Sequence, residues 1–355
     1  MSSERGSREG HFVGLKARCC GPSARYPMRV MNNRTWLGVG AGVALASVLL
    51  RKRFDWRRKV VVITGGARGL GLLLAQEVLR RGGKVAICAR DGDEVERAKG
   101  ALQGAVFGAA CDVRDRAELQ QFLSRATQAL GPIDVLINNA GVIQVGPMEE
   151  MTVEDYDNAM RVHFYAPLHA ILEVLPQMRR RRAGRIINIA SIGAKVAVPH
   201  LLPYSASKFA LYGLSAGLRA ELAKDGIVVT TVCPGLMRTG SARHASMKGQ
   251  AEAEYAWFKV SSSLPILAMS PERAARQILD ASARGQAEVV LSLPAKVLAT
   301  LHGVMPSFVQ NVLGVVTRAL PAPGGAGRPN VEGKNVEPPL LTPLTSEIAA
   351  RNNEF

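Results

Sequence analysis

Tyr204 and Lys208 are the residues whose types and spacing are best suited to acid–base chemistry. They stand four positions apart in a helix-like stretch, so their side chains share one helix face. A free tyrosine has a pKa of about 10, and a nearby positive charge lowers that pKa because it favours tyrosinate. Ser191 ends an apolar run thirteen residues before Tyr204 and carries a hydroxyl that can donate a hydrogen bond. Taken alone, a tyrosine and a lysine at this spacing are more often a surface pair, so the prediction depends on the surrounding pattern.

A glycine-rich turn, Thr64-Gly65-Gly66-Ala67-Arg68-Gly69-Leu70-Gly71, follows an apolar strand and opens an amphipathic helix. In such a context the first glycine permits a tight turn, the second lets the backbone approach a pyrophosphate, and the third lets helix and strand pack closely. The free N–H groups and the dipole of the helix start favour a phosphate. The turn therefore predicts a dinucleotide site, and its flanking pattern argues against an ordinary glycine-rich loop.

The elements that must position these residues are short apolar runs alternating with amphipathic segments. Several runs are nearly all apolar, as strands covered on both faces should be. The strands are expected at residues 60–63, 84–89, 106–111, 135–137, 185–189, 228–233 and 289–291, and helices at 70–81, 116–130, 153–178, 205–224 and 271–283. This alternation predicts one α/β domain of Rossmann type, with a doubly wound parallel sheet of about seven strands in three αβα layers.

The glycine spacing T-G-x-x-x-G-x-G and four later marks resemble the short-chain dehydrogenase/reductase family. The marks are Asp112 after the third strand, Asn138-Asn139-Ala140-Gly141 after the fourth, Tyr204-Ser205-Ala206-Ser207-Lys208 opening a helix, and Cys233-Pro234-Gly235 with Thr239 after the sixth. Each mark alone is weak, whereas all of them in register are specific. The resemblance covers residues 59–293 and implies hydride transfer between a nicotinamide cofactor and an alcohol or carbonyl group.

The resemblance also implies a role for each matching catalytic residue. Tyr204 is expected to act as general acid and base, Lys208 to hold the ribose hydroxyls and tune the phenol, and Ser191 to donate to the substrate oxygen. The positive nicotinamide ring of NADP⁺ is expected to favour tyrosinate as well. Ser207 is expected to be structural.

The cofactor-binding set implied by the resemblance spans several segments of the chain. Thr239 is expected to bond the carboxamide or a phosphate of the cofactor, while Asp112 and Asn139 meet the adenosine half or brace the strand ends. The whole set is Thr64, Gly65, Ala67, Arg68, Gly69, Leu70, Gly71, Arg90, Asp112, Val113, Asn139, Ala140, Gly141, Tyr204, Lys208, Pro234, Gly235 and Thr239.

The end of the second strand bears on which nicotinamide cofactor is used. Ala89 stands where the family pattern would place an acidic residue for the ribose 2′-hydroxyl of NAD, and Asp91 and Asp93 come too late. Arg90 and Arg68 can instead pair with a 2′-phosphate, which suits the guanidinium fork. The sequence predicts NADP(H) as the cofactor, with NAD(H) as the alternative. In that alternative, Arg90 and Arg68 are merely solvated loop residues.

His163 departs from the family pattern, which expects an Asn twenty-two residues after Gly141 to anchor a water in a proton relay. A histidine can hold that water through a ring nitrogen, titrate within the relay, or break it. The first two readings are favoured, and His163 is therefore counted with the catalytic residues. The rate and the pH optimum depend on this substitution, whereas cofactor binding does not.

Charge and cysteine usage exclude several other classes of function. The net charge is +16, yet residues 1–59 hold thirteen Lys and Arg against three Asp and Glu, so the rest of the chain is only mildly basic. This charge distribution therefore argues against nucleic-acid binding by the rest of the chain. The five cysteines include no C-x-x-C pair and no cluster at metal-ligand spacing, which predicts free thiols and no metal site. Cys88, Cys111 and Cys233 close apolar runs and are expected to be small buried residues.

The amino-terminal region carries an uncharged apolar stretch at residues 36–50, followed by six Lys and Arg up to Lys59. A cleaved signal peptide and a buried helix of a soluble domain are alternatives. However, this stretch is not followed by the small-residue cleavage site of a signal peptide, and it has no polar face as a soluble helix would. A single membrane anchor at residues 35–51 is favoured, with the catalytic domain facing the cytoplasm. Residues 1–34 are expected to be disordered, and the true start is Met1 or Met31.

The carboxyl-terminal region divides into two parts. Residues 294–320 are mostly apolar and are expected to form helices that cap the core, make a dimer face or touch a membrane; these alternatives stay open. Residues 321–355 are rich in Pro and Gly and are expected to be an extended tail.

The segment after Thr239, through about Pro265, is expected to cover the substrate. Its apolar residues include Met237, Met247, Tyr255, Trp257, Phe258, Leu264 and Ile266, which line a pocket or simply pack. Together with the expected anchor, they favour a small hydrophobic alcohol or carbonyl substrate and a membrane lipid as partner. The resemblance implies a homodimer or homotetramer. A catalytically impaired NADPH-binding scaffold or sensor and a peripheral lipid-binding protein are the alternative functions.

Overall fold

Seven apolar runs form one parallel sheet in the computed structural model, which describes residues 53–263, 268–324 and 330–337. The strand order is β3-β2-β1-β4-β6-β7-β9, as a doubly wound sheet requires. Every residue of the central strands β1 and β4 is buried, because helices cover both faces. The strands are β1 (Val60–Thr64), β2 (Lys84–Ala89), β3 (Val106–Ala110), β4 (Val135–Asn138), β6 (Gly184–Ile189), β7 (Ile227–Pro234) and β9 (Glu288–Leu291). The predicted fold class is confirmed.

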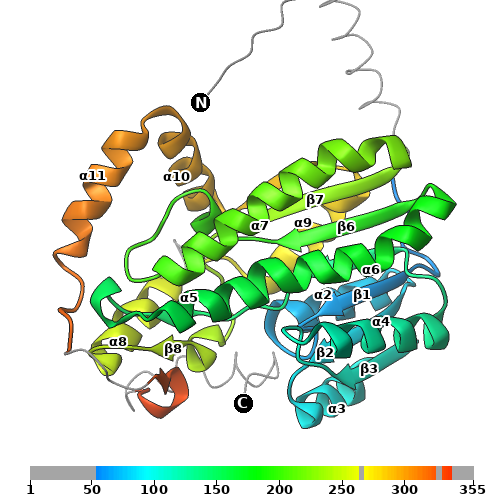
Figure 1. Cartoon of the computed structure of the whole chain (residues 1–355), viewed down its shortest axis with the longest axis horizontal. Helices are drawn as coiled ribbons and strands as arrows, with labels where there is room; N and C mark the ends of the chain where they lie inside the picture. Colours follow the sequence, from blue (N-terminus) through cyan, green and yellow to red (C-terminus); the bar gives the residue numbers. More distant parts are fainter. Residues whose placement is uncertain (1–52, 264–267, 325–329, 338–355) are drawn as a thin grey trace, which may run out of the picture. The chain divides into compact units, whose positions relative to one another are not determined.

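Helices cover the two faces of this sheet (Figure 1). One apolar core lies between the sheet and α2, α3 and α9, and the other between the sheet and α4 and α6 with the adjoining α7. The bounds are α2 (Gly69–Arg80), α3 (Gly92–Ala101), α4 (Arg116–Leu130), α5 (Val153–Met160), α6 (Ala166–Arg181), α7 (Leu202–Glu221), α8 (Ala251–Ser263) and α9 (Pro271–Ala283). Alternate residues of each strand point to opposite faces of the sheet. Because an apolar core lies on each face, successive residues of the strands are apolar.

The helix expected at residues 153–178 is interrupted. A π-helical turn, Arg161–Tyr165, joins α5 to α6 without ending the helix. Thr152 starts α5 with a capping box, because Asp155 accepts from its backbone N–H at 2.7 Å. Single π turns inside helices are often found at functional sites, and this one holds His163.

A second sheet of three short strands lies outside the main one. It runs in the order β10-β8-β5, from β5 (Gln144–Val145), β8 (Ser246–Met247) and β10 (Val331–Glu332), and we call it the accessory sheet. Val331 pairs with Met247, and Glu337 accepts from Arg243 at 2.8 Å. The expectation of an extended tail after residue 320 is therefore wrong for residues 330–337, because those residues pair and pack with the segment after β7.

The two helices α10 (Leu293–Val304) and α11 (Pro306–Thr317) form a hairpin. Ala295 and Val309 are their only buried residues, while Leu293, Val304 and Phe308 are among nine large apolar side chains exposed from Leu293 to Val316. The hairpin therefore covers little of the core, and the core-capping alternative for residues 294–320 stays a prediction beside the other two. The dimer and membrane alternatives concern partners outside the chain.

The predicted anchor at residues 35–51 and the predicted disordered segment before it lie outside the described residues. Among the residues that the structure does describe, no helix is both long enough and apolar enough to cross a bilayer. The described residues belong to one unit, which runs from Lys52 to Phe355.

The cysteines of the described part are buried, unpaired thiols. Cys88 lies on β2, Cys111 directly after β3, and Cys233 on β7. A hydrogen bond with Cys111, together with burial, raises the pKa of Cys88, and burial raises the pKa of Cys233 to about 12. These thiols behave as small apolar core residues, as expected, and no metal-ligand cluster occurs within the described ranges.

Candidate active site

Ser191, Tyr204 and Lys208 come together at the carboxyl end of β6. Ser191 follows this strand, and α7 supplies the other two residues from adjacent turns. The Ser191 hydroxyl and the Tyr204 ring lie beside the same glycine, since a Cβ at Gly193 would be 3.4 Å from the hydroxyl oxygen and 3.3 Å from the ring. The Lys208 ammonium lies 5.7 Å from the centre of the Tyr204 ring and donates to the Ile189 carbonyl at 2.9 Å. The structure thus brings together the three side chains that the sequence separates by up to seventeen residues.

Burial controls the protonation of this group. It lowers the pKa of Lys208 to about 7, because the ammonium is taken out of water. Burial also raises the pKa of Tyr204 and outweighs the opposing hydrogen bond from Ser191. Two charges, the Lys208 ammonium and the nicotinamide ring, are expected to lower the phenol pKa; in the protein by itself burial prevails, and this pKa lies above its ordinary value.

His163 is completely buried, and both of its ring nitrogens are hydrogen-bonded. Its Nε2 accepts from the Val142 N–H at 3.1 Å, so the proton lies on Nδ1, which donates to the Ser207 hydroxyl at 2.7 Å. Ser207 in turn donates to the Tyr204 carbonyl at 2.9 Å. Burial, reinforced by the charge of Lys208, lowers the pKa of His163 well below its ordinary value.

These contacts change the interpretation of His163. A neutral ring with both nitrogens used holds no relay water and does not titrate near neutrality. Its edge faces the Tyr204 ring, with the centres 5.3 Å apart and the planes at 87°. His163 thus fixes the loop after β4 against the turn of α7 that carries Tyr204, and Ser207 has the structural role expected for it.

The glycine turn has the shape that a dinucleotide requires. Gly65 and Gly69 have φ angles of 61° and 52°, in the left-handed region that favours glycine. A Cβ at Gly71 would lie 2.1 Å from the Gly65 carbonyl oxygen, so only glycine fits between turn and helix. No side chain caps the start of α2, which leaves its first N–H groups to a phosphate. Ala67 and Leu70 are buried beneath the turn.

Asn139 braces this turn from the neighbouring strand. Its side-chain amide donates to the carbonyls of Thr64 and Gly65 at 3.1 and 2.8 Å. The Thr64 hydroxyl accepts from the backbone N–H groups of Asn139 and Ala140. The loops after β1 and β4 are thereby joined at the point where the strand order reverses, which is where ligands bind in such sheets. Of the two roles expected for Asn139, the structure places it in the bracing one.

The far end of the predicted cofactor site is lined by charged residues. Arg90 is exposed directly after β2, near enough to Asp112 to affect its pKa. Burial opposes ionisation of Asp112, but hydrogen bonds from Arg114 hold its pKa below the ordinary value. Asp91 caps α3 by accepting from the N–H groups of Asp93 and Glu94, so it does not replace the missing acidic residue at Ala89.

Arg68 is held in place beside the glycine turn. Its guanidinium donates to Glu94 at 3.1 Å and lies 3.1 Å from Nδ1 of His244. No sequence pattern indicates this contact, because Glu94 and His244 stand 26 and 176 residues away. It restrains the one basic side chain that the turn itself supplies.

The remaining predicted residues lie after β3, β4 and β7. Val113 is buried, and Gly141 lies against His163. Pro234 ends β7, and a Cβ at Gly235 would lie 2.7 Å from the Ser292 hydroxyl, so the chain passes close to the start of α10. The Thr239 hydroxyl donates to Ser241 at 2.9 Å. All these segments follow the carboxyl ends of strands, on the same edge of the sheet as Ser191.

Comparison with known proteins gives one consistent result. A family model described as short chain dehydrogenase matches residues 59–249. A relative named as a ketoacyl reductase of the granaticin polyketide synthase of Streptomyces violaceoruber is 34% identical over 218 residues, covering 59% of this chain and 80% of the relative. A solved short-chain dehydrogenase of Streptomyces avermitilis is 28% identical with a TM-score of 0.65, covering 74% of this chain and 98% of that one.

A second solved structure is that of an actinorhodin polyketide ketoreductase variant with NADPH. It is 29% identical to this chain with a TM-score of 0.59, and the match covers 66% of this chain and 95% of that one. The matched region holds the glycine turn, the braced loop after β4 and the Ser191, Tyr204 and Lys208 group. The chain described here therefore belongs to the short-chain dehydrogenase family of oxidoreductases.

Proposed function

We propose that the protein is an NADP(H)-dependent oxidoreductase that interconverts a hydrophobic alcohol and its ketone or aldehyde. The observation that carries this proposal is the convergence of Ser191, Tyr204 and Lys208: the Ser191 hydroxyl and the Tyr204 ring flank Gly193, and the Lys208 ammonium lies 5.7 Å from the centre of the same ring. When bound, NADP(H) supplies or accepts the hydride. The residues of the chain then have to orient the oxygen and move one proton.

In the direction of reduction, Ser191 donates a hydrogen bond to the carbonyl oxygen, and Tyr204 gives that oxygen a proton as the C–O bond becomes an alcohol. Oxidation reverses both steps, and the phenol then takes the proton. Lys208 contributes from a fixed position, because its bond to the Ile189 carbonyl restrains the long side chain. His163 acts through Ser207 and the loop after β4, as a positioning residue.

NADP(H) is favoured over NAD(H) by the end of β2. The strand ends in Ala89, which carries no carboxylate, and the first carboxylate after it, that of Asp91, is used to cap α3. Arg90 and Arg68 provide cations on the two sides of that position, and a guanidinium matches the geometry of a 2′-phosphate. The relative solved with NADPH is consistent with this choice.

An apolar substrate is favoured by the side chains that pack with Tyr204. Ile143, Val198 and Leu201 belong to the same apolar cluster as its ring. Met247, Tyr255 and Phe258, by contrast, are buried in the core of that cluster, so packing is the correct interpretation for these three residues. Leu264 and Ile266 lie outside the described residues.

The test of this proposal is steady-state reduction of aliphatic ketones, cyclic ketones and a β-ketoacyl thioester in detergent, followed by NADPH absorbance. Tyr204→Phe is expected to lower kcat by at least 100-fold, because general acid catalysis contributes roughly 10²- to 10⁴-fold. NADPH affinity, measured by fluorescence, should change less than twofold. Turnover by Tyr204→Phe at the wild-type rate would refute the proposed role.

The same titration tests the cofactor. Arg90→Ala and Arg68→Ala are expected to weaken NADPH binding about tenfold or more each, and NADH binding less than threefold, because only NADPH carries the 2′-phosphate. The exposed Arg97→Ala on α3 is the control. Equal effects on NADPH and NADH binding would show that the two arginines are surface residues that do not contact the 2′-phosphate. NAD(H) would then be left as the cofactor.

A second candidate function is an NADPH-binding scaffold or sensor with impaired turnover. The specific observation in its favour is His163, whose two nitrogens are both hydrogen-bonded. Tight NADPH binding without turnover of any ketone, together with activity gained in His163→Asn, would favour this candidate. Wild-type turnover that His163→Asn does not increase would favour the enzyme.

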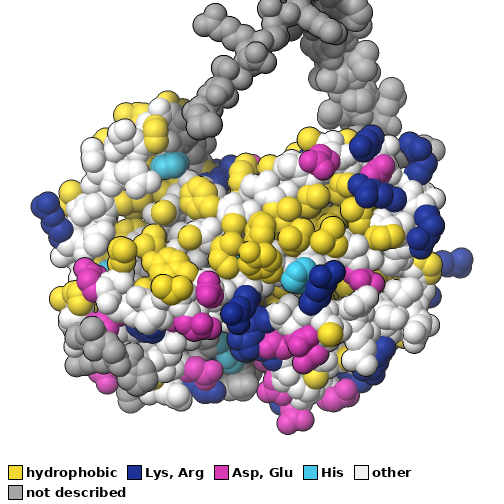
Figure 2. All heavy atoms as spheres, viewed as in Figure 1, with side chains coloured by type: hydrophobic (Ala, Val, Ile, Leu, Met, Phe, Trp, Pro, Cys, Tyr) yellow, Lys and Arg dark blue, Asp and Glu magenta, His cyan; other side chains and the backbone are white. Residues whose placement is uncertain are grey.

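The proposal includes partners beyond the substrate. Figure 2 shows hydrophobic side chains gathered on the face covered by α5, α6 and α7, where Tyr165, Leu172 and Phe209 are exposed. This face favours a homodimer or homotetramer, which light scattering of the wild type and Phe209→Glu would test. A monomeric wild type would contradict it.

We also propose a membrane lipid as partner and a catalytic domain facing the cytoplasm. The support is the uncharged sequence at residues 36–50 with its following basic residues, and the exposed apolar hairpin α10–α11, which contains no Asp or Glu. Sedimentation of the full chain with vesicles of anionic and neutral lipid tests this proposal. A chain that stays in the supernatant with both vesicles would contradict it.

A further inference from the structure

His200 has an unusual backbone conformation for a bulky residue. Its φ of 60° is left-handed, as is that of three other non-glycine residues in the described ranges, Arg58, Arg182 and Ser292. Of these four residues, His200 alone is buried. Such a conformation is strained for a residue with a side chain and persists only where the surrounding contacts impose it.

Those contacts join three separate segments at one residue. The Nδ1 atom of His200 lies 2.7 Å from Oε1 of Glu254 on α8. The carbonyl of His200 accepts from the Gly146 N–H, just after β5, at 2.9 Å. Tyr204 stands four residues later, in the first turn of α7. The turn before the catalytic helix is thus tied to α8 and to the accessory sheet.

Glu254, the partner of His200, is itself held in place by its surroundings. Glu254 is completely buried, and its Oε2 accepts from the Trp257 indole at 2.6 Å. The edge of the His200 ring also meets the Trp257 ring at 82°. A buried carboxylate is expensive, and a well-packed apolar contact of the same size would hold α8 with no such cost. A directional polar contact instead fixes where α8 sits.

We propose that His200 and Glu254 are positioning residues that set α8 and the accessory sheet against Tyr204, and so fix the substrate side of the active site. The contact acts on substrate binding through α8 and the apolar neighbours of Tyr204, and leaves the phenol itself and the glycine turn unaffected. This inference rests on the proposed function for its kinetic prediction. Its structural prediction, that breaking the contact frees α8, needs no substrate.

Three variants separate the contact from the backbone strain. His200→Gly removes the side chain but accepts the left-handed φ, so strain is not introduced. His200→Asn also tolerates this φ and keeps a shorter polar side chain. Glu254→Gln keeps the shape of the partner but loses one of its two acceptors. Glu252→Gln, an exposed carboxyl on the same helix, is the matched control.

The experiment uses the full chain and two readouts. Hydrogen exchange of residues 251–261, with NADPH and without ketone, is expected to be at least fivefold faster in His200→Gly and Glu254→Gln than in the wild type. KM for the best ketone of the panel is expected to rise at least fivefold, with kcat and NADPH affinity within twofold of wild type. His200→Asn should lie between His200→Gly and wild type, and Glu252→Gln should match wild type.

The double variant His200→Gly/Glu254→Gln is expected to be no worse than the more severe single variant, because both remove one contact. Exchange and KM within twofold of wild type in both single variants would overturn the proposal. A matching loss of NADPH affinity would also overturn it, since that result assigns the pair a general folding role. If even the wild type reduces no ketone, the proposed function fails, and the exchange of α8 alone decides the positioning role.

Discussion

At the scale of single residues, the buried ammonium of Lys208 links stability to pH. Its pKa is about 7 in the folded protein, against an ordinary value of 10.5. Between these two values the unfolded chain binds more protons than the native chain, so the free energy of unfolding rises with pH. Below about pH 7 both states are protonated, and the cost of burying the charge is present in full.

The expected outcome is measured by urea unfolding of the cofactor-free protein at pH 7 and pH 9. Lys208 is expected to add about 2 kcal/mol to the difference in unfolding free energy between these two pH values, at about 1.4 kcal/mol per pKa unit. Lys208→Met removes the titrating group, so its stability should rise less over this range. Parallel pH curves for the wild type and Lys208→Met would contradict the lowered pKa.

The sequence identified Ser191, Tyr204 and Lys208 because their order and spacing are local properties of the chain. It did not reveal the state of His163, since that depends on Val142 and Ser207, 21 and 44 residues away. A buried histidine with two partners and a histidine in a relay have the same sequence pattern. The burial that raises the pKa of Tyr204 likewise becomes visible only in three dimensions.

At the scale of elements, the contact of α2 with the turn after β1 decides whether a pyrophosphate can bind. A Cβ at Gly71 would meet the Gly65 carbonyl oxygen at 2.1 Å and the Asn139 amide nitrogen at 2.6 Å. Both are held by other hydrogen bonds or by the backbone, so neither can easily move. A side chain introduced at Gly71 would therefore disturb both the glycine turn and the Asn139 side chain that braces it.

Gly71→Ala is expected to weaken NADPH binding at least tenfold and to lower the unfolding free energy by about 1–3 kcal/mol, as overpacking does. Fluorescence titration and urea unfolding measure the two effects. Gly100→Ala on α3 is the control, because nothing lies within 4 Å of its Cβ position. It should raise stability by up to about 1 kcal/mol through helix propensity. Normal NADPH affinity in Gly71→Ala would mean that the turn adapts.

Helix and strand positions were predicted well where periodicity and end signals agree. Arg116–Leu130 and Pro271–Ala283 match their expected bounds, since Asp115 and Ser270 cap them. The π turn at Arg161–Tyr165 was not predicted, because the apolar pattern continues through it. The start of α7 was placed three residues late, since Leu202 and Pro203 precede the recognised motif.

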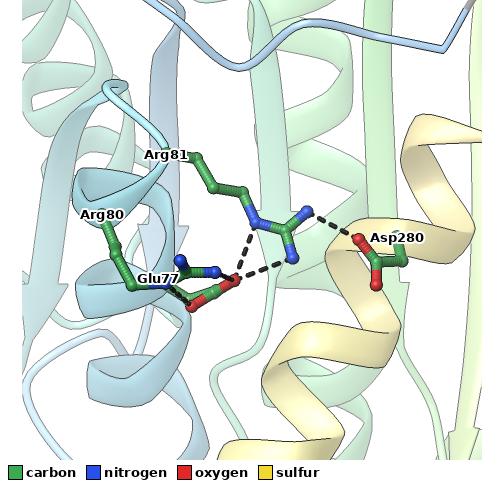
Figure 3. A network of polar contacts seen from close by, with 4 residues as sticks. All are labelled: Glu77, Arg80, Arg81 and Asp280. Atoms are coloured by element: carbon green, nitrogen blue, oxygen red, sulfur yellow. Dashed lines mark hydrogen bonds and ion pairs between the residues drawn. The ribbon is translucent and has the colours of Figure 1, made fainter.

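At the scale of the whole domain, a polar network joins α2 to α9 on one face of the sheet (Figure 3). Arg81 donates to Glu77 and to Asp280, each at 2.8 Å, and Arg80 also donates to Glu77. Burial opposes ionisation of Glu77, but the two arginines hold its pKa below the ordinary value. The ionised Glu77 carboxyl stabilises the fold above about pH 4.5, and this stabilisation is lost as the pH falls through the pKa of Glu77 in the folded protein.

Arg81→Leu is expected to lower the unfolding free energy by about 2 kcal/mol at pH 7, because it removes charged hydrogen bonds between two elements. Arg80→Leu should cost less than about 1 kcal/mol, since Arg80 is 67% exposed. Urea unfolding at pH 7 and pH 4 measures both, and the Arg81 loss should shrink at the lower pH. Equal losses for the two variants would show that the link to Asp280 contributes nothing.

The seven-stranded architecture could be predicted because alternating strands and helices admit few topologies. The accessory sheet could not, since its strands are two residues long and come from positions 144, 246 and 331. Residues 330–337 look like a tail in composition, yet Asn330 accepts from Gln144, and Gly333 lies beneath Tyr255. Only the folded chain shows that residues 330–337 pair and pack with the segment after β7.

The buried thiols offer a way to follow how the sheet opens. Cys88 and Cys111 lie in the half formed by β1 to β3, and Cys233 lies on β7 in the other half. Alkylation of each needs its own half to separate from the covering helices. Mass-spectrometric timing of the three modifications would therefore reveal whether the half around β1 to β3 and the half around β7 come apart together or one before the other.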